Sequence, residues 1–292
     1  MTQNEYTFGG MHCKSWLADN EKAKLQIIHG LGEMSEYYEQ AGEYFTKRGI
    51  SVYLCEYRCH GRTKLAADID DILQISADEC YYFSENTASA SDTPLFLLGH
   101  SLGAQMVQYI LGKHGGNLYN GVIMTGCPYI ENTDELLLDI DKEAEIRGND
   151  APSIDVFMKV FGRVAEPFEE KCTVSWVTSD IERALYYEKL PYTNVMYSCR
   201  FYKSFLRLSA QVQQKNYLSE VAKKPPLLIM SGTMDTVGQF GQYAKQKADE
   251  LENCGFKVEC HLFDGMRHSI LQERNRTDVM RIITEFAQKQ FS

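Results

Sequence analysis

The sequence lacks the features of a membrane-inserted or exported protein. No uninterrupted apolar stretch approaches the ~18 residues that a membrane-spanning helix needs. The first residues, MTQNEYTFGG, contain neither the basic start nor the apolar run of a signal peptide. These absences predict a soluble protein that is retained in the cytoplasm and makes no stable insertion into a membrane.

Positive charge is also scarce. The chain has 30 Lys and Arg against 40 Asp and Glu, which gives a formal net charge of −10. Nucleic-acid partners are bound mainly through basic residues that neutralise phosphates, and anionic membranes attract basic patches in the same way. The charge balance therefore argues against nucleic acid, and against docking on anionic membranes.

Metal and cofactor motifs are missing as well. The nine cysteines are scattered without CxxC spacing, and Cys55 and Cys59 lack the second pair that a zinc site would need. No glycine-rich phosphate loop and no cofactor motif is found. We therefore expect no metal and no cofactor, and reduced thiols that in several cases pack as small apolar side chains.

The overall composition, with 44% hydrophobic and 24% charged residues in 292 positions, is typical of a globular protein with a sizeable core. After two strands expected at 5–8 and 11–17, joined at Gly9-Gly10 as an antiparallel edge, strands and helices alternate. This alternation predicts an α/β fold with a mostly parallel, doubly wound sheet and right-handed crossovers. The expected strands are 24–28, 50–57, 95–98, 122–125, 227–230 and 257–263.

The alternation stops between residues 129 and 214. This segment has helical patterns, one isolated candidate strand at 172–177, and many aromatic residues. An insertion of this length between sheet strands is typical of a cap or of a separate domain. We interpret it as a helical cap over a core formed by 1–128 and 215–292, because its apolar side chains need the open top of the core to cover them.

The clearest chemical motif is Gly99-His100-Ser101-Leu102-Gly103. It follows an apolar run typical of a buried strand and precedes a segment with helical spacing, so the chain must turn sharply at Ser101. In this context the GxSxG motif predicts a nucleophile elbow, in which the serine hydroxyl is presented at the top of the sheet.

Two further strand ends carry the residues that such a serine needs. A serine hydroxyl requires an imidazole to take its proton, and the imidazole requires a carboxylate to fix its tautomer. His268 is the expected base and Asp235 the expected acid, which gives the chain order Ser, Asp, His of α/β hydrolases. Asp264 is the rival acid, but it stands only four residues before His268 and is better explained as a structural loop residue.

The oxyanion donors are expected to be backbone N–H groups. Leu102 N–H lies at the start of the helix after the elbow, and Leu31 N–H lies in the loop after the first parallel strand. The neighbouring histidines have simpler interpretations. His29 and His60 are expected to shape loops through hydrogen bonds, and His100 to pack into the sheet.

Four stretches together resemble the monoacylglycerol lipase and lysophospholipase group of α/β hydrolases, sometimes classed with serine aminopeptidases. The resemblance implies the α/β-hydrolase fold, the triad Ser101, Asp235 and His268, the oxyanion amides of Leu31 and Leu102, and a helical cap over an acyl pocket. The stretches are HGLGEMSEYYEQAGEYFTKRGISVYLCEYRCHGRT, GHSLG, SGTMDTV and GMRHSILQE.

Three positions depart from the pattern of this group. Met34 stands where His is usual, Glu56 where Asp is usual and Cys59 where Gly is usual. None belongs to the triad. Met34 is expected near the oxyanion loop, where it would bear on the identity of the substrate.

The leading hypothesis is a serine carboxylic ester hydrolase that forms an acyl-enzyme on a monoacylglycerol, a lysophospholipid or a similar small lipid ester. An amide hydrolase of the aminopeptidase type and a non-catalytic scaffold with the same fold are the alternatives. The sequence leaves open the head group, the acyl length, the movement of the cap and the oligomeric state.

Overall fold

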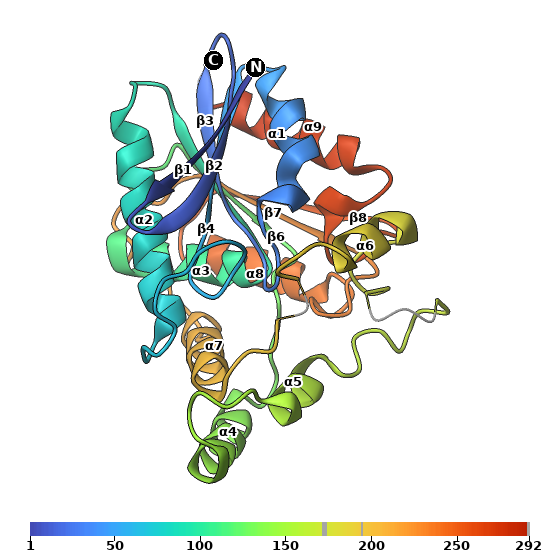
Figure 1. The fold of residues 1–292 in the computed structure, drawn as a ribbon. Coiled ribbons are helices and arrows are strands. Elements are labelled where there is room, and N and C mark those ends of the chain that lie inside the picture. Colours follow the sequence, from blue (N-terminus) through green and yellow to red (C-terminus); the bar gives the residue numbers. More distant parts are fainter. Residues whose placement is uncertain (171–173, 194, 291–292) are drawn as a thin grey trace.

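The structure is a computed structural model that describes residues 1–170, 174–193 and 195–290. A twisted eight-stranded sheet runs through its centre (Figure 1). The order of the strands across the sheet is β1-β2-β4-β3-β5-β6-β7-β8. The strands are β1 Thr2–Phe8, β2 Met11–Leu17, β3 Ala23–Ile28, β4 Ile50–Glu56, β5 Leu95–His100, β6 Gly121–Thr125, β7 Leu227–Gly232 and β8 Val258–Phe263.

The pairing of the strands confirms the predicted fold class. β1 pairs with β2 and β2 with β4 in antiparallel fashion, and every pair from β4 to β8 is parallel. The antiparallel N-terminal edge is therefore present. β1 begins earlier than predicted, at Thr2, because this polar and largely exposed edge strand has little hydrophobic alternation to mark its start.

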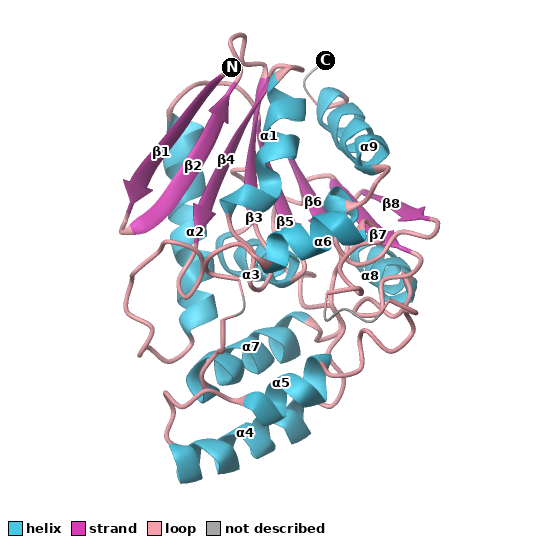
Figure 2. Cartoon of the chain, turned by 45° about the vertical axis from the view of Figure 1, so that its right-hand side comes forward, coloured by secondary structure: helices cyan, strands magenta, loops and turns pink. Residues whose placement is uncertain are grey.

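Helices cover both faces of the sheet (Figure 2). Apolar residues of α1 and α9 form one buried cluster with the strands, and those of α2, α3 and α8 belong to a second. This arrangement is the predicted double winding. The helices are α1 Glu39–Thr46, α2 Ile72–Ser89, α3 Leu102–His114, α8 Gln242–Asn253 and α9 Arg276–Gln288, with short 3₁₀ turns η1 Ser35–Tyr38 and η2 Ile270–Gln272.

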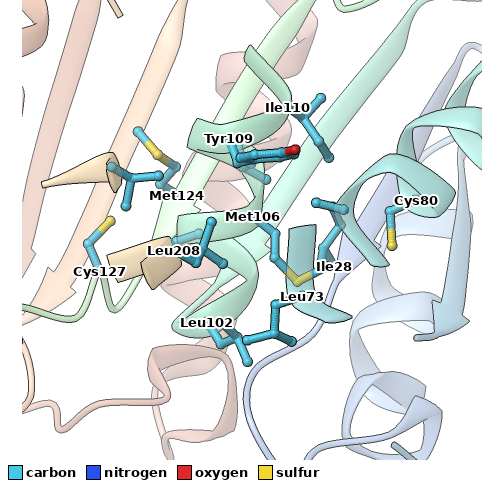
Figure 3. Packing of buried hydrophobic residues seen from close by; sticks show 14 of the residues in the cluster. Ile28, Leu73, Cys80, Leu102, Met106, Tyr109, Ile110, Met124, Cys127 and Leu208 are labelled. Atoms are coloured by element: carbon cyan, nitrogen blue, oxygen red, sulfur yellow. The ribbon is translucent and has the colours of Figure 1, made fainter. Parts of the chain in front are cut away.

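The apolar run of β5 supplies both clusters. Phe96 and Leu98 face α1 and α9, whereas Leu95 and Leu97 face the opposite side, because successive side chains of a strand alternate. On that opposite side Met106 of α3 packs near Ile28 and Leu73 (Figure 3). The strand that leads to Ser101 is thus fixed from both faces.

The segment between β6 and β7 contains α4 Thr133–Arg147, α5 Ile154–Phe161, α6 Ile181–Glu188 and α7 Cys199–Val212. In both ribbon views α4, α5 and α7 lie beyond the edge of the sheet at which β5 ends and α3 begins. The predicted strand at 172–177 is wrong in its described part. Residues 172 and 173 lie outside the described residues, and 174–177 form a turn closed by a hydrogen bond from Val177 N–H to Val174 O of 3.0 Å.

The expectation that all cysteines are reduced thiols is also wrong. Cys13 and Cys55 form a disulfide. They lie directly opposite each other on the antiparallel strands β2 and β4, with their Cα atoms 4.1 Å apart, as in a pair without ladder hydrogen bonds. The described free cysteines are Cys59, Cys80, Cys127, Cys199, Cys254 and Cys260, and Cys172 lies outside the described residues.

Candidate active site

Ser101 forms the turn between β5 and α3. Its backbone has a φ of 53° and a ψ of −118°, a conformation that residues with a side chain rarely adopt. The flanking glycines make the turn possible, since a Cβ on Gly103 would lie 2.0 Å from Ile28 O and one on Gly99 2.3 Å from Gly103 O. Ser101 N–H donates to Thr125 O at 2.9 Å. The local sequence therefore folds into the predicted elbow.

The structure brings Ser101, His268 and Asp235 together. Ser101 Oγ lies 2.9 Å from His268 Nε2, and His268 Nδ1 lies 2.9 Å from Asp235 Oδ1. Because an ionised carboxylate can only accept, Nδ1 carries the proton and donates to Asp235, and Nε2 accepts from the serine hydroxyl. The arrangement can move a proton from the hydroxyl to the imidazole.

The surroundings of Asp235 keep its carboxylate ionised. Burial alone would raise the pKa of Asp235, but His268 and the N–H of Gly238 lower it, and the net result is a pKa below the ordinary value. Its Oδ1 also accepts from Val237 N–H at 3.0 Å and Gly238 N–H at 3.1 Å, and its Oδ2 accepts from Ser231 Oγ at 3.2 Å. These donors fix the carboxylate that orients the imidazole.

Asp264, the rival acid, faces away from this chain of bonds. Its side chain is exposed and accepts from Thr233 Oγ1 at 3.2 Å, and Thr233 Oγ1 also accepts from Gly265 N–H at 2.9 Å. The residue therefore stabilises the turn between β8 and His268, as expected of a loop carboxylate.

Leu31 and Leu102, whose N–H groups are the expected oxyanion donors, line the same cavity as Ser101 and His268. Leu102 is the first residue of α3, where backbone N–H groups have no partner within the helix. Leu31 lies in the loop after β3, beside Gly32, whose φ is 74°. Because β3 pairs with β5, the loops after these two neighbouring strands place Leu31 and Leu102 at the same cavity.

The cavity above Ser101 has a volume of about 320 Å³. Its walls are mainly apolar, and the segment between β6 and β7 contributes most of them. Glu33 and Glu188 are the acidic residues in the lining, and no Lys or Arg is found among the described residues that line it. The lining from the insertion includes Phe157, Phe161, Trp176, Val195, Met196, Tyr197, Tyr202 and Phe205.

Three further histidines lie around the site. His100 borders the cavity, with Nδ1 3.0 Å from Thr125 Oγ1 and Nε2 2.9 Å from Ser269 Oγ. His60 Nδ1 lies 2.9 Å from Arg58 O and its Nε2 lies 3.0 Å from Tyr197 Oη, which joins the loop after β4 to the insertion. His29 Nδ1 lies 2.8 Å from Gly30 O. His29 and His60 bond to their own loops, as expected, whereas His60 and His100 also bond to distant segments, the insertion and the loop that carries His268.

These buried histidines make stability depend on pH. Burial lowers the pKa of His60 from 6.5 to about 3 and that of His29 from 6.5 to about 4. Both rings are therefore neutral in the folded protein, whereas the unfolded chain takes up protons as pH falls below about 6.5. The contribution of these two histidines to stability is therefore fully present above pH 6.5 and is lost as the pH falls toward their folded-state pKa values.

We expect the free energy of unfolding to drop by about 2 kcal/mol for each of the two histidines between pH 7 and pH 5. Urea titrations at both pH values measure this drop. In His60→Asn the drop in the free energy of unfolding between the two pH values should be smaller by about 2 kcal/mol. His261→Asn, which changes a side chain that is 40% exposed to water, should leave this drop unchanged. If the drop in His60→Asn equals that of the unsubstituted protein, the buried His60 ring is not a source of the pH dependence.

The insertion is tied to the loop that carries His268. His268 N–H donates to Trp176 O at 3.3 Å and Ser269 N–H to Val177 O at 2.8 Å. Glu273, which is 2% exposed, accepts from Ser179 N–H at 2.9 Å and Arg267 N–H at 2.8 Å, and from the hydroxyl of Ser179. Glu273 is not among the site residues expected from the sequence. The SILQE stretch marks its position, but its partner in the insertion, Ser179, is 94 residues away in the sequence.

The three departures from the family pattern lie outside the cavity lining. Glu56 is fully buried and accepts from Ser35 N–H at 3.1 Å, from Ser35 Oγ at 2.8 Å and from Arg62 Nη1 at 3.1 Å. Cys59 has a φ of 65°, a conformation that glycine adopts more easily. Met34 is buried directly after the loop that carries Leu31, so it supports this loop without facing the cavity.

Neither a metal-binding cluster nor a membrane-spanning helix occurs among the described residues. No group of three or more His, Cys, Asp or Glu side chains among them could hold a metal ion. None of the helices that they form combines the length and the apolar character needed to cross a bilayer.

Comparison with known proteins identifies the family. A sequence model described as serine aminopeptidase, S33, matches residues 19–275. The monoglyceride lipase homolog of monkeypox virus is 25% identical over 270 residues, which cover 90% of this chain and 88% of the relative. The phospholipase YtpA of Bacillus subtilis is 24% identical over 276 residues, which cover 93% of this chain and 97% of the relative. The crystal structure of a thermostable carboxyl esterase from Bacillus coagulans, in complex with glycerol, has the same fold, with a TM-score of 0.91 at 20% identity over 100% of both chains. The chain therefore belongs to the serine aminopeptidase S33 family of α/β hydrolases.

Proposed function

We propose that the protein is a serine ester hydrolase that cleaves small lipid esters through an acyl-enzyme. The observation that carries this proposal is the chain of hydrogen bonds from Ser101 through His268 to Asp235 at the base of an apolar cavity. The names of the relatives, a monoglyceride lipase homolog and a phospholipase, agree with an ester-cleaving activity.

The proposed mechanism begins with attack by Ser101 Oγ on the ester carbonyl carbon. His268 Nε2 takes the hydroxyl proton, and the N–H groups of Leu31 and Leu102 stabilise the negative oxygen of the tetrahedral intermediate. The carbon–oxygen bond to the alcohol then breaks, and the imidazolium returns the proton to the departing alcohol oxygen. Water, activated by the same imidazole, attacks the acyl-enzyme and releases the carboxylic acid.

The charges in the cavity favour an ester of an uncharged alcohol. The apolar wall suits an acyl chain, whereas Glu33 and Glu188 would repel a phosphate near the leaving group. We therefore place a monoacylglycerol or a similar neutral ester ahead of an anionic lysophospholipid.

We also propose that residues 129–214 act as a helical cap over the core formed by 1–128 and 215–292. The support is that α4 to α7 all lie between β6 and β7 and that this segment supplies most of the apolar cavity wall. A cap of this kind would exclude water from the acyl chain during the reaction.

A panel of esters tests the proposed function. Purified protein should hydrolyse p-nitrophenyl esters and 1-monoacylglycerols, with a higher kcat/KM for the monoacylglycerol than for the lysophosphatidic acid of the same acyl length. The absence of hydrolysis for every chain length would refute the ester hydrolase, whereas equal rates on the two lipids would refute only the preference for an uncharged alcohol.

A second candidate is an amide hydrolase that releases N-terminal residues. The observation that favours it is the pair of carboxylates in the cavity, which could bind a substrate ammonium group, together with the description of the family. Amino-acid amides and esters of the same amino acid, compared at equal concentration, decide between the two. Faster cleavage of the amide would favour the peptidase.

Glu273 joins the insertion to the loop that carries His268, so its substitution should affect catalysis as well as stability. Glu273→Ala removes the acceptor of three hydrogen bonds beside the proposed base, so kcat for an ester should fall roughly ten- to a hundredfold as His268 loses its position. Stability should fall by about 2 kcal/mol because buried N–H groups lose their partner.

A matched control separates position from stability. Glu39→Ala also removes a carboxylate that accepts from two side chains, Lys14 and Trp16, but these lie on β2 and away from the cavity. It should destabilise the protein and leave kcat unchanged at temperatures well below unfolding. Equal losses of kcat in the two variants would show that Glu273 has no particular link to catalysis.

A further inference from the structure

The loop at residues 29–33, between β3 and η1, carries one of the two proposed oxyanion donors, the N–H of Leu31. A side chain can be oriented by its own rotamer, but a main-chain donor is oriented only by the plane of its peptide unit. The bonds that hold the peptide unit between Gly30 and Leu31 therefore decide where this N–H points.

This peptide unit is held from its carbonyl side. In a planar trans peptide the C=O and the N–H point in opposite directions, so fixing Gly30 O also fixes the direction of Leu31 N–H. Gly30 O lies 2.8 Å from His29 Nδ1, 3.3 Å from Glu33 N and 3.4 Å from Tyr57 Oη. Three donor groups thus surround the oxygen opposite the proposed oxyanion donor, and the single proton of the Tyr57 hydroxyl is shared between this oxygen and His29 O.

The preceding peptide unit is held as well. Tyr57 Oη donates to His29 O at 3.2 Å, and Gly30 N–H donates to Glu33 Oε2 at 2.8 Å. Tyr38 Oη donates to the same carboxylate oxygen at 2.6 Å and so fixes the Glu33 side chain. A Cβ on Gly30 would lie 3.1 Å from the His100 ring and 3.2 Å from Glu33 Oε2, which leaves little room for the loop to move.

The protonation state of His29 allows its ring to donate a hydrogen bond to Gly30 O. A carbonyl oxygen can only accept, so Nδ1 must carry the proton that points at Gly30 O. Burial lowers the pKa of His29 to about 4, and the ring is neutral at pH 7 with Nε2 free of a proton. The ring stacks on Tyr57 with centroids 4.2 Å apart and an angle of 10° between the planes, so the two side chains support each other.

We propose that His29, Glu33 and Tyr57, here called the loop clamp, are positioning residues that aim Leu31 N–H at the carbonyl oxygen of the substrate. The proposal rests on the proposed ester hydrolase function. Tyr57 is fully buried and does not line the cavity, so it acts on the substrate only through the loop. The backbone donor cannot be deleted by substitution of a side chain, but the loop clamp can be weakened.

A pair of substrates reports on the oxyanion site alone. In a thionoester the carbonyl oxygen is replaced by sulfur, which is larger and accepts hydrogen bonds more weakly, so oriented N–H donors assist its reaction much less. A change in the loop clamp should therefore slow an ester more than its thionoester. A general disturbance of Ser101 or His268 should slow both substrates alike.

Tyr57→Phe is the first test. We expect kcat for a p-nitrophenyl ester to fall about tenfold, a part of the ~10²-fold or larger loss seen when an oxyanion donor is removed, and kcat for the matching thionoester to change by less than about twofold. Tyr119→Phe is the matched control, because Tyr119 is a buried tyrosine whose hydroxyl donates to Ser84 Oγ at 2.9 Å, outside the cavity. It should leave both rates and their ratio unchanged.

Glu33→Gln provides a second variant, since it keeps the shape of the side chain and weakens its hold on Gly30 N–H and on Tyr38. A lowered ester-to-thionoester ratio in both variants supports the proposal. An unchanged ratio, with ester hydrolysis intact in the unsubstituted protein, overturns the loop clamp alone. If the unsubstituted protein hydrolyses neither substrate, the proposed function fails and the loop clamp fails with it.

Discussion

Replacing Ser101 with alanine is expected to lower kcat for ester hydrolysis by about 10⁴-fold or more, with KM little changed. Loss of the nucleophile removes the acyl-enzyme route altogether, and only the slow attack of water in the remaining site is left. The substitution keeps the elbow intact, because alanine is smaller than serine and the turn depends on Gly99 and Gly103.

The measurement compares initial rates on a p-nitrophenyl ester for Ser101→Ala and the unsubstituted protein, purified in the same way. Melting temperatures should agree closely, which shows that the loss is chemical. A variant with more than a small fraction of the original rate would mean that another residue is the nucleophile or that the activity belongs to a contaminant.

Replacing Asp235 with asparagine is expected to lower kcat by roughly 10³- to 10⁴-fold. The amide would no longer hold the proton on His268 Nδ1, so Nε2 would lose its readiness to take the proton of Ser101. The imidazolium formed during attack would also lose the negative charge that stabilises it, and this charge is buried beside the ring.

Asp264→Asn is the matched control for this prediction. The two residues were rival candidates for the acid, and the structure places Asp264 in an exposed turn bonded to Thr233. Its substitution should change kcat less than about twofold, in line with a surface change. A large loss in Asp264→Asn, or activity retained in Asp235→Asn, would reverse the assignment of the acid.

The sheet and the elbow could be predicted because their signals are local. The strands at 95–98 and 227–230 are apolar at every position, as parallel strands with helices on both faces must be. The ends of such strands meet at one edge of the sheet, so residues placed just after them were expected to converge. The positions of Ser101, Asp235 and His268 agree with that expectation, and their chemical roles remain a proposal.

The features that were missed depend on contacts between distant segments. Cys13 and Cys55 are 42 residues apart, and only the register of β2 against β4 brings them face to face. Likewise, Glu273 contacts Ser179 because a turn of the insertion runs along the His268 loop, which no periodicity in either stretch indicates. The strand predicted at 172–177 was wrong for the same reason, because a strand needs a neighbouring strand to pair with. The described part of this stretch, 174–177, pairs with no strand and forms a turn.

The reactivity of Ser101 toward a fluorophosphonate probe tests the central proposal most directly, because the probe forms a bond only with an activated serine. Intact protein should gain one phosphonyl group, and peptide mass spectrometry should place it on Ser101. Labelling should be slowed by about 10³-fold or more in His268→Ala, since the base that activates the hydroxyl is lost. No labelling of the folded protein, or equal labelling rates with and without His268, would contradict the proposed catalytic triad and favour a scaffold without catalysis.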